Sequence, residues 1–282
     1  MLSYCPYIKN ELERNMPFTL SHIVAAIPVK QVLKKRTDFL ALVIGSMIPD
    51  LAYFLPFNVG RDFSHSLLGV FLFCLPLGIL LYAAFHLVLK LPLLDLSFGF
   101  IKRRIGPELN APYCFTIRKA LIVLSALILG IAGHLLWDSF THSDSFMVSH
   151  FSVFHTTIEL YEGIYLPLYL LLQHLSSIAG LILLGFFWGK WLVKTKHFSY
   201  DFSSLFSKTI MWVFRFVIML VPVIGSFVLA FLASWHRGLF GFLKQLVLWL
   251  VFTGGKIFLF LLCVYVVIWW IYKLVASIKK TD

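Results

Sequence analysis

Three residues with metal-binding side chains follow one another at helical spacing near the end of an apolar run. His134, Asp138 and His142 are each four positions apart, which places neighbouring pairs on one face of any helix that continues through all of them. Imidazole and carboxylate groups are ligands for zinc, and also for manganese and iron. The spacing therefore predicts a divalent metal site at this end of the run.

The apolar run itself, residues 119–133, is hydrophobic enough to enter a membrane. Ionisable groups at the edge of a membrane span cost free energy unless they are paired or bound to an ion, so they mark a functional site by default. The alternative is that these polar residues only cap a transmembrane helix at the membrane interface.

The composition is typical of an integral membrane protein. Hydrophobic residues make up 60% of the 282-residue chain and charged residues 13%, with a mean hydropathy of +0.89, whereas soluble domains carry about 25% charged residues. The net charge of +11 would suggest nucleic acid binding in a soluble protein, but these basic residues cluster in short loops. We therefore expect membrane lipid as a partner and no nucleic acid. The four cysteines show no CxxC spacing, which argues against a thiolate metal site.

We predict an all-α, polytopic bundle with about five to six transmembrane helices. The expected spans lie at about 67–89, 120–137, 164–189, 210–234 and 246–271. A short helical hairpin, residues 22–33 and 38–50, precedes them and turns at Lys34-Lys35-Arg36. Each arm rises only roughly 18 Å, less than the ~30 Å hydrocarbon core, so whether the hairpin spans the membrane is left open.

Composition divides the chain into three segments. Residues 1–15 form a charged N-terminal extension that lacks the apolar core of a signal peptide. Residues 16–189 form a membrane-embedded domain that carries the metal site. Residues 190–282 form a C-terminal pair of transmembrane helices with a basic tail.

The distribution of basic residues predicts the orientation in the cell (inner) membrane. Most of the 24 Lys and Arg residues fall into the loops around 30–36, 90–119 and 190–208 and into the tail, which we assign to the cytoplasm. The loop 138–163 has no Lys or Arg, as expected on the other side. This topology brings six candidate ligands to the extracytoplasmic interface: His22, Asp50, His65, His134, Asp138 and His142.

The sequence around these ligands resembles an uncharacterised bacterial membrane-protein family. The motifs are Met16-Pro-Phe-Thr-Leu-Ser-His22, Gly45-Ser-Met-Ile-Pro49-Asp50, Ser64-His65-Ser66 and His134-Leu-Leu-Trp137-Asp138-Ser-Phe-Thr141-His142. Their order is similar to that of the membrane-bound metal-dependent hydrolases and, more distantly, to that of zinc-dependent phospholipase C. The resemblance covers roughly residues 16–180 and leaves the last two spans outside.

The resemblance implies roles for the six ligands. His22 and Asp50 would bind metal, with Asp50 a candidate bridge between two ions, and His65 would be shared with the second position. His134 and Asp138 match the helical His-x-x-x-Asp ligand pair of the phospholipase type, followed by His142. The candidate catalytic residues are Asp50, His65 and His142.

Two further pairs are candidate additional site residues. His155 and Glu159 have the spacing of a later His-x-x-x-Glu ligand pair of the phospholipase type. Gln173 and His174 belong to a Gln-His-Leu-Ser-Ser motif that resembles one in the uncharacterised family; they would contact the ligands or the substrate. The alternative for this motif is a patch of hydrogen bonds between membrane helices.

Two functions from different classes fit these observations. The first is a metal-dependent hydrolase with one or two ions, zinc before manganese or iron, acting on an ester or phosphoester such as a lipid headgroup at the outer membrane–water boundary. The second is a non-catalytic membrane protein in which the cluster holds a structural metal, forms a polar network or conducts ions. A conduit would need polar residues across the bilayer, and the sequence offers few. We therefore favour the hydrolase.

Overall fold

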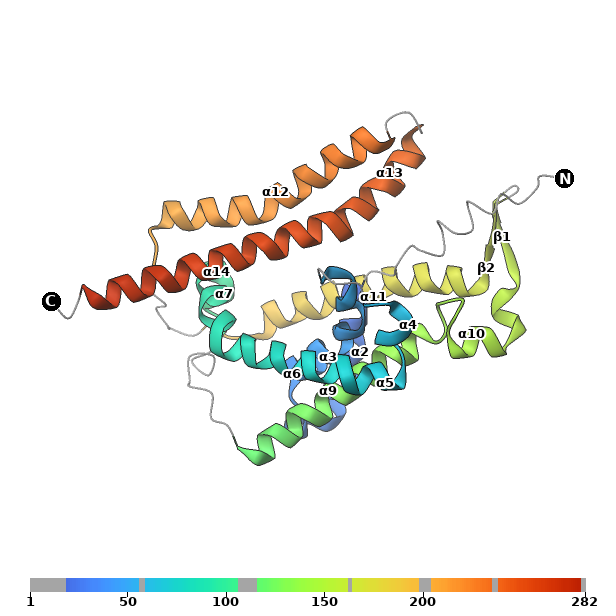
Figure 1. The fold of residues 1–282 in the computed structure, drawn as a ribbon, viewed down its shortest axis with the longest axis horizontal. Helices are drawn as coiled ribbons and strands as arrows, with labels where there is room; N and C mark the ends of the chain where they lie inside the picture. Colours follow the sequence, from blue (N-terminus) through green and yellow to red (C-terminus); the bar gives the residue numbers. More distant parts are fainter. Residues whose placement is uncertain are drawn as a thin grey trace. The chain divides into compact units, whose positions relative to one another are not determined.

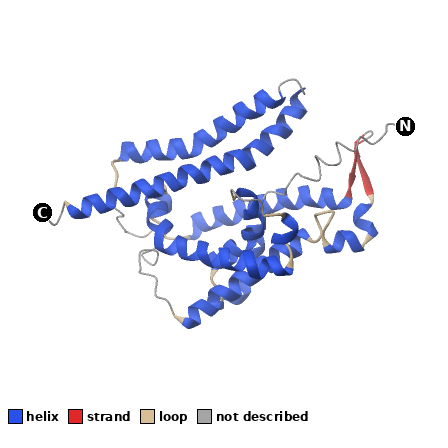
Figure 2. Cartoon of the chain, viewed as in Figure 1, coloured by secondary structure: helices blue, strands red, loops and turns tan. Residues whose placement is uncertain are grey.

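The computed structural model is mostly helical, which confirms the predicted all-α class (Figures 1 and 2). It describes residues 19–55, 59–105, 116–161, 164–197, 204–234 and 238–279. The proposed extension 1–15, the start of the first motif and the turn around His236 lie outside the described residues. Within the described part, five helices are long and apolar enough to cross a membrane: Leu67–Leu96, Ile117–Asp138, Leu168–Lys194, Lys208–Ser234 and Gly241–Ile278.

The chain forms two compact units, which are described separately. Unit 1 comprises residues 1–82 and 115–190, and unit 2 comprises residues 83–114 and 191–282. The division at residue 190 that we inferred from composition stays a prediction. The second unit also includes residues 83–114, of which residues 83–96 belong to the candidate span Leu67–Leu96.

Unit 1 begins with the short helical hairpin expected from the sequence. After the 3-10 turn η1 (Thr19–His22), helix α2 (Ile23–Leu33) runs into the basic turn η2 (Lys34–Arg36) and helix α3 (Phe39–Leu51) returns. Asp38 caps α3, because its Oδ1 accepts a hydrogen bond from the Ala41 N–H at 3.0 Å. The hairpin thus brings His22 and Asp50 to the same end of the unit.

Polar side chains cap two of the remaining helices of unit 1. Short helices α4 (Arg61–Ser64) and α5 (Leu67–Gly69) carry His65 between them, and Ser66 caps α5. A continuous helical segment then runs through η4 (Val70–Cys74) and α6 (Leu75–Ala84). Beyond helix α9 (Ile117–Asp138), which Thr116 caps, come α10 (Phe146–His150), η7 (Ser152–His155) and α11 (Leu168–Lys194). A one-turn η3 (Ala52–Phe54) follows α3.

Helices α3 and α9 make the most extensive contact between two helices of unit 1 in the described part of the chain (Figure 1). A Cβ atom added at Gly45 would overlap the backbone of Leu127, and one added at Gly130 would overlap the Leu42 carbonyl. Only glycine allows this approach, as is common where membrane helices pack through small residues. Since both helices run toward the ligands at their C-terminal ends, their separation sets the distance between Asp50 and His134.

A two-stranded antiparallel sheet departs from the all-helical expectation for residues 157–167 (Figure 2). Strand β1 (Thr157–Tyr161) pairs with β2 (Ile164–Pro167), with Glu159 opposite Tyr165. The span expected from residue 164 therefore begins only at Leu168. The β-branched and aromatic residues of β1 and β2 favour strands over a helix. Pro167 fits at a helix start but not in a helix interior, so the helix begins after it.

Unit 2 contains η5 (Phe85–Leu89), α7 (Lys90–Leu96), α8 (Gly99–Lys102), α12 (Lys208–Ser234), and a long helix made of α13 (Gly238–Trp249), η9 (Leu250–Gly254) and α14 (Gly255–Ile278). Asp95 is fully buried within it. Its carboxylate accepts hydrogen bonds from the Leu205 N–H at 3.1 Å and Trp269 Nε1 at 2.9 Å and pairs with Lys102 at 3.1 Å. A buried carboxylate with this many partners joins α7 to α14 and to the segment that precedes α12, so we assign Asp95 a structural role.

Candidate metal centre

Four side chains from three segments converge at one end of unit 1. Asp50 comes from α3, His65 follows α4, and His134 and Asp138 come from α9. One ligand atom of each lies within 4.8 Å of the other three. Asp50, His134 and Asp138 are at most 2% exposed. This group, Asp50, His65, His134 and Asp138, is called the ligand cluster below.

The distances within the ligand cluster are those expected around a tetrahedral ion. His65 Nε2 lies 3.2 Å from His134 Nε2, 3.3 Å from Asp138 Oδ2 and 3.6 Å from Asp50 Oδ1. His134 Nε2 lies 3.5 Å from Asp138 Oδ2 and 3.6 Å from Asp50 Oδ1. An ion bound tetrahedrally at about 2.0–2.2 Å separates its ligand atoms by roughly 3.3–3.6 Å. The four groups could therefore hold a metal ion with little movement.

Backbone carbonyls orient both imidazoles of the cluster. His134 Nδ1 donates to the Ser46 carbonyl at 2.9 Å, and His65 Nδ1 donates to the Arg61 carbonyl at 3.1 Å. Each hydrogen bond fixes the proton on Nδ1 in the neutral ring and leaves Nε2 as a lone-pair donor. Two such nitrogens 3.2 Å apart require a proton or a metal ion between them, and the two carboxylates beside them would stabilise the positive charge of either one.

His22 lies beside the ligand cluster and is fully buried. Its Nε2 is 3.5 Å from Asp138 Oδ1, and its ring packs on His134 with the centroids 4.3 Å apart. Within the described residues, three buried atoms have no hydrogen-bond partner: the two ring nitrogens of His22 and Asp138 Oδ1. Buried polar atoms are almost always satisfied, so these three atoms indicate a further ligand, such as an ion shared by His22 and Asp138.

His142 reaches the cluster from a turn and not from the helix. Helix α9 ends at Asp138, so the condition that it continue to His142 is not met. His142 is nevertheless buried, with its Nδ1 3.6 Å from Asp138 Oδ2 and its Nε2 3.4 Å from Gln173 Nε2. The Asp138 carboxylate thus lies within 3.6 Å of four histidines, His22, His65, His134 and His142. This makes Asp138 a better candidate bridge between two ions than Asp50.

Arg61 supplies a positive charge at the edge of the cluster. Its Nη2 lies 3.4 Å from Asp138 Oδ2, and its Nη1 donates to Asp144 Oδ2 at 2.5 Å. Its side chain is 16% exposed, compared with 3% for that of Asp138. A guanidinium placed between the buried ligands and the surface is well suited to bind a carboxylate or phosphate.

The surroundings of His22, His65 and His142 shift the pKa values of these three imidazoles. Burial disfavours the charged form of His65, but hydrogen bonds to Asp138 and Asp50 outweigh burial and raise its pKa. Burial lowers the pKa of His142 and, with the neighbouring His134, lowers the pKa of His22 to about 4. His22 is therefore neutral at pH 7, which is the form that binds metal.

The other candidate residues lie outside the cluster or face away from it. Gln173 is buried and contacts His142, whereas its neighbour His174 is exposed. His155 ends η7 and packs edge-on against Tyr169, and Glu159 lies in β1. The helical spacing of His155 and Glu159 is therefore not realised, because a 3-10 turn and a strand occupy these positions. Their assignment as metal ligands stays a prediction without geometric support.

Most of the chain matches the model of a protein family. A model for a domain of unknown function, DUF4184, matches residues 16–277. The chain belongs to this family. The DUF4184 match starts where the resemblance was expected to start, but it extends through the last two spans, which we had placed outside. No curated protein and no solved structure matches the chain.

Sequence reasoning missed three contacts of the site. The Ser46 carbonyl orients His134 across 88 positions, and Arg61 contacts Asp138 and Asp144 across 77 and 83 positions. The available signal was that Arg61 is the one Lys or Arg residue between residues 51 and 66, close to His65.

Proposed function

We propose that this integral membrane protein is a metal-dependent hydrolase of an ester or phosphoester. The ligand cluster would bind one or two divalent ions, zinc before manganese or iron, at the extracytoplasmic interface of the cell membrane. The single observation that carries the proposal is the set of five ligand-to-ligand distances between 3.2 and 3.6 Å. The chemistry of the donors supports it, because imidazole and carboxylate suit zinc and similar ions.

The helices themselves favour a cation at the cluster. Asp50 is the penultimate residue of α3 and Asp138 is the last residue of α9. The C-terminal end of a helix carries a partial negative charge, equivalent to roughly half an elementary charge. Two helix ends and two carboxylates therefore concentrate negative charge where the histidines converge.

The surroundings of the cluster support catalysis over a purely structural ion. His22, His142 and Arg61 all lie within 3.6 Å of Asp138, although a structural site needs only four ligands. A divalent ion bound here would polarise an ester or phosphoryl oxygen and make a bound water more acidic. Arg61 would orient an anionic substrate, and His142 or His65 would transfer the proton to the leaving group.

Lipid is the substrate class that we favour. The cluster lies at the end of α9, a candidate membrane span, and would therefore lie near the depth of lipid headgroups if α9 crosses the membrane. A phosphodiester linkage at that depth would meet the guanidinium of Arg61 and the ion together. This step rests on analogy with membrane-bound hydrolases and on the expected topology.

A specific observation favours a second function. Four protein ligands around one point, three of them almost fully buried, match the number of ligands in a structural metal site. In this reading the ion fixes α3 and α9 to the segment around His65 and takes no part in chemistry.

An activity assay separates the two functions. Full-length protein in detergent, loaded with zinc or manganese, is assayed against bis(p-nitrophenyl) phosphate, a p-nitrophenyl carboxylic ester and phospholipid in mixed micelles. If the protein is a hydrolase, we expect turnover of at least one of these substrates, and a metal chelator should abolish it. We also expect that Arg61→Gln keeps its metal but loses about 100-fold in kcat/KM for the phosphodiester, because a charge that stabilises the transition state is removed.

The neighbouring carboxylate provides a control. Asp62 is exposed, so Asp62→Asn should leave kcat/KM unchanged. Metal-loaded wild type that hydrolyses none of the three substrate classes would eliminate the hydrolase and leave the structural ion.

A further inference from the structure

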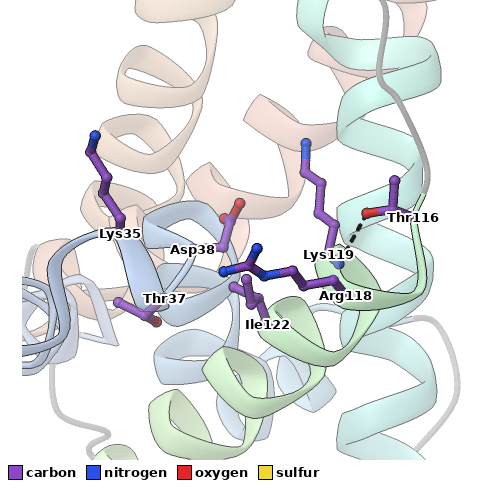
Figure 3. Close-up of a pocket in the computed structure, with 7 residues that line it drawn as sticks. All are labelled: Lys35, Thr37, Asp38, Thr116, Arg118, Lys119 and Ile122. Atoms are coloured by element: carbon purple, nitrogen blue, oxygen red, sulfur yellow. Dashed lines mark hydrogen bonds between the residues drawn. The ribbon is translucent and has the colours of Figure 1, made fainter.

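A cavity of about 290 Å³ opens at the end of unit 1 opposite to the ligand cluster. Figure 3 shows the residues that line it, which come from the basic turn before α3 and from the first turns of α9. They are Lys35, Thr37, Asp38, Thr116, Arg118, Lys119 and Ile122. Arg118 and Ile122 precede His134 by 16 and 12 residues, or about 18–24 Å along α9. The cavity is therefore a separate place from the candidate metal centre.

The lining of the cavity is positively charged. Lys35, Arg118 and Lys119 contribute three cations and Asp38 one carboxylate. The Asp38 carboxylate is already engaged, since it caps α3 and accepts from the Tyr82 hydroxyl at 2.9 Å. In the part of the chain that the structure describes, Lys35 and Arg118 form no ion pair. In Figure 3 the ammonium ends of Lys35 and Lys119 point the same way. The cavity thus holds positive charge that its own carboxylate does not balance.

A buried hydroxyl group in the lining lacks a partner. Thr37 is only 4% exposed, and among the described residues nothing hydrogen-bonds to its Oγ1. A hydroxyl left unsatisfied in this way costs roughly 1–3 kcal/mol. Its presence beside the three cations is a second, independent sign that the cavity receives a hydrogen-bonding ligand.

Two helices direct their N-terminal ends at the same cavity. Asp38 and Thr116 are the N-caps of α3 and α9, and both line it. The N–H groups and partial positive charge of a helix N-terminus favour anions. Because α9 has 22 residues, its dipole is fully developed there. Charge, hydroxyl and helix ends therefore all select an anion with oxygen acceptors.

The position of the cavity indicates the source of that anion. Helix α9 is a candidate membrane span that begins at Ile117, so its first turn lies at a membrane boundary. Ile122 extends the lining toward the apolar part of the span. We propose that this cavity binds the phosphate of an anionic phospholipid, with Lys35, Arg118 and Thr37 as the principal contacts.

The proposal can be tested on the full-length protein with phosphatidylglycerol as the probe. Native mass spectrometry of detergent-solubilised protein gives the affinity for the first bound lipid, beside phosphatidylcholine. We expect tighter binding of phosphatidylglycerol, and we expect the double variant Lys35→Gln/Arg118→Gln to weaken it on the order of tenfold or more. The control Lys190→Gln/Lys194→Gln removes the same charge from exposed lysines at the end of α11 and should bind like wild type.

Thr37→Val distinguishes a ligand contact from a folding defect. This variant removes an unsatisfied hydroxyl, so its melting temperature without lipid should equal or exceed that of wild type, while its gain on adding phosphatidylglycerol should shrink. Equal lipid affinity in wild type and the Lys35/Arg118 variant would overturn the proposal. Stabilisation by inorganic phosphate that matches the lipid would also overturn it, because a free phosphate site would then be indicated.

Discussion

Replacing Asp138 by Asn is expected to abolish stable metal binding and to destabilise unit 1. Asp138 lies within 3.6 Å of four histidines and of Arg61. The isosteric amide keeps the volume of the side chain but removes its negative charge. Metal affinity should therefore fall more than about 100-fold, because even the loss of a residue that only supports a metal ligand lowers the affinity about 10–100-fold. In the metal-free protein, Arg61 and His65 would lose their buried counter-ion at a cost of about 3–5 kcal/mol. Competition with a chelator measures the affinity, and denaturant unfolding in detergent measures the stability.

Asp144 provides the matched control for Asp138. It also pairs with Arg61, but its side chain is 51% exposed, and exposed ion pairs contribute about 0–1 kcal/mol. Asp144→Asn should therefore change neither the metal affinity nor the stability by more than about 1 kcal/mol. Wild-type metal affinity in Asp138→Asn would show that the cluster is not the binding site.

Gly130→Ala is expected to disturb the site without touching a ligand. The added Cβ would overlap the Leu42 carbonyl and lie 2.9 Å from both Gly45 Cα and the Ser46 nitrogen. These are backbone atoms that cannot rotate away, so α3 and α9 must separate, at a cost of about 3 kcal/mol. Since α3 carries Asp50 and α9 carries His134, metal affinity should fall together with the melting temperature.

Gly133→Ala tests whether this effect comes from the helix contact. Gly133 lies one turn further along α9, and a Cβ there would meet only the Ala25 side chain at 3.8 Å, an ordinary contact. Alanine at this position should be neutral or stabilise the helix by up to about 1 kcal/mol. Equal losses in both variants would mean that helix α9 tolerates no alanine for reasons other than the contact with α3.

Local periodicity predicted the elements well and one ligand pair directly. His134 and Asp138 were found because a helix places residues four apart on one face, and the spans were found because a bilayer requires long apolar helices. His22, Asp50 and His65 could be placed near them only through the expected topology and the family resemblance. The structure brings all five together, which the spacing in sequence alone does not dictate.

What the sequence did not reveal depends on contacts between distant segments. The end of α9 at Asp138, the position of His142 on a turn and the Arg61–Asp144 pair have no local signature. The strand pair at 157–167 was hidden because short apolar runs fit a strand or a helix equally well.

Metal content measured by elemental analysis decides whether the ligand cluster binds metal. Detergent-purified wild type is compared with His134→Ala, Asp50→Ala and, as a control, His150→Ala, which removes an exposed histidine outside the cluster. We predict about one or two divalent ions per chain in wild type and in the control, and none in either cluster variant. Wild-type protein that stays metal-free after incubation with zinc and with manganese would show that the cluster is a buried polar network and not a metal site.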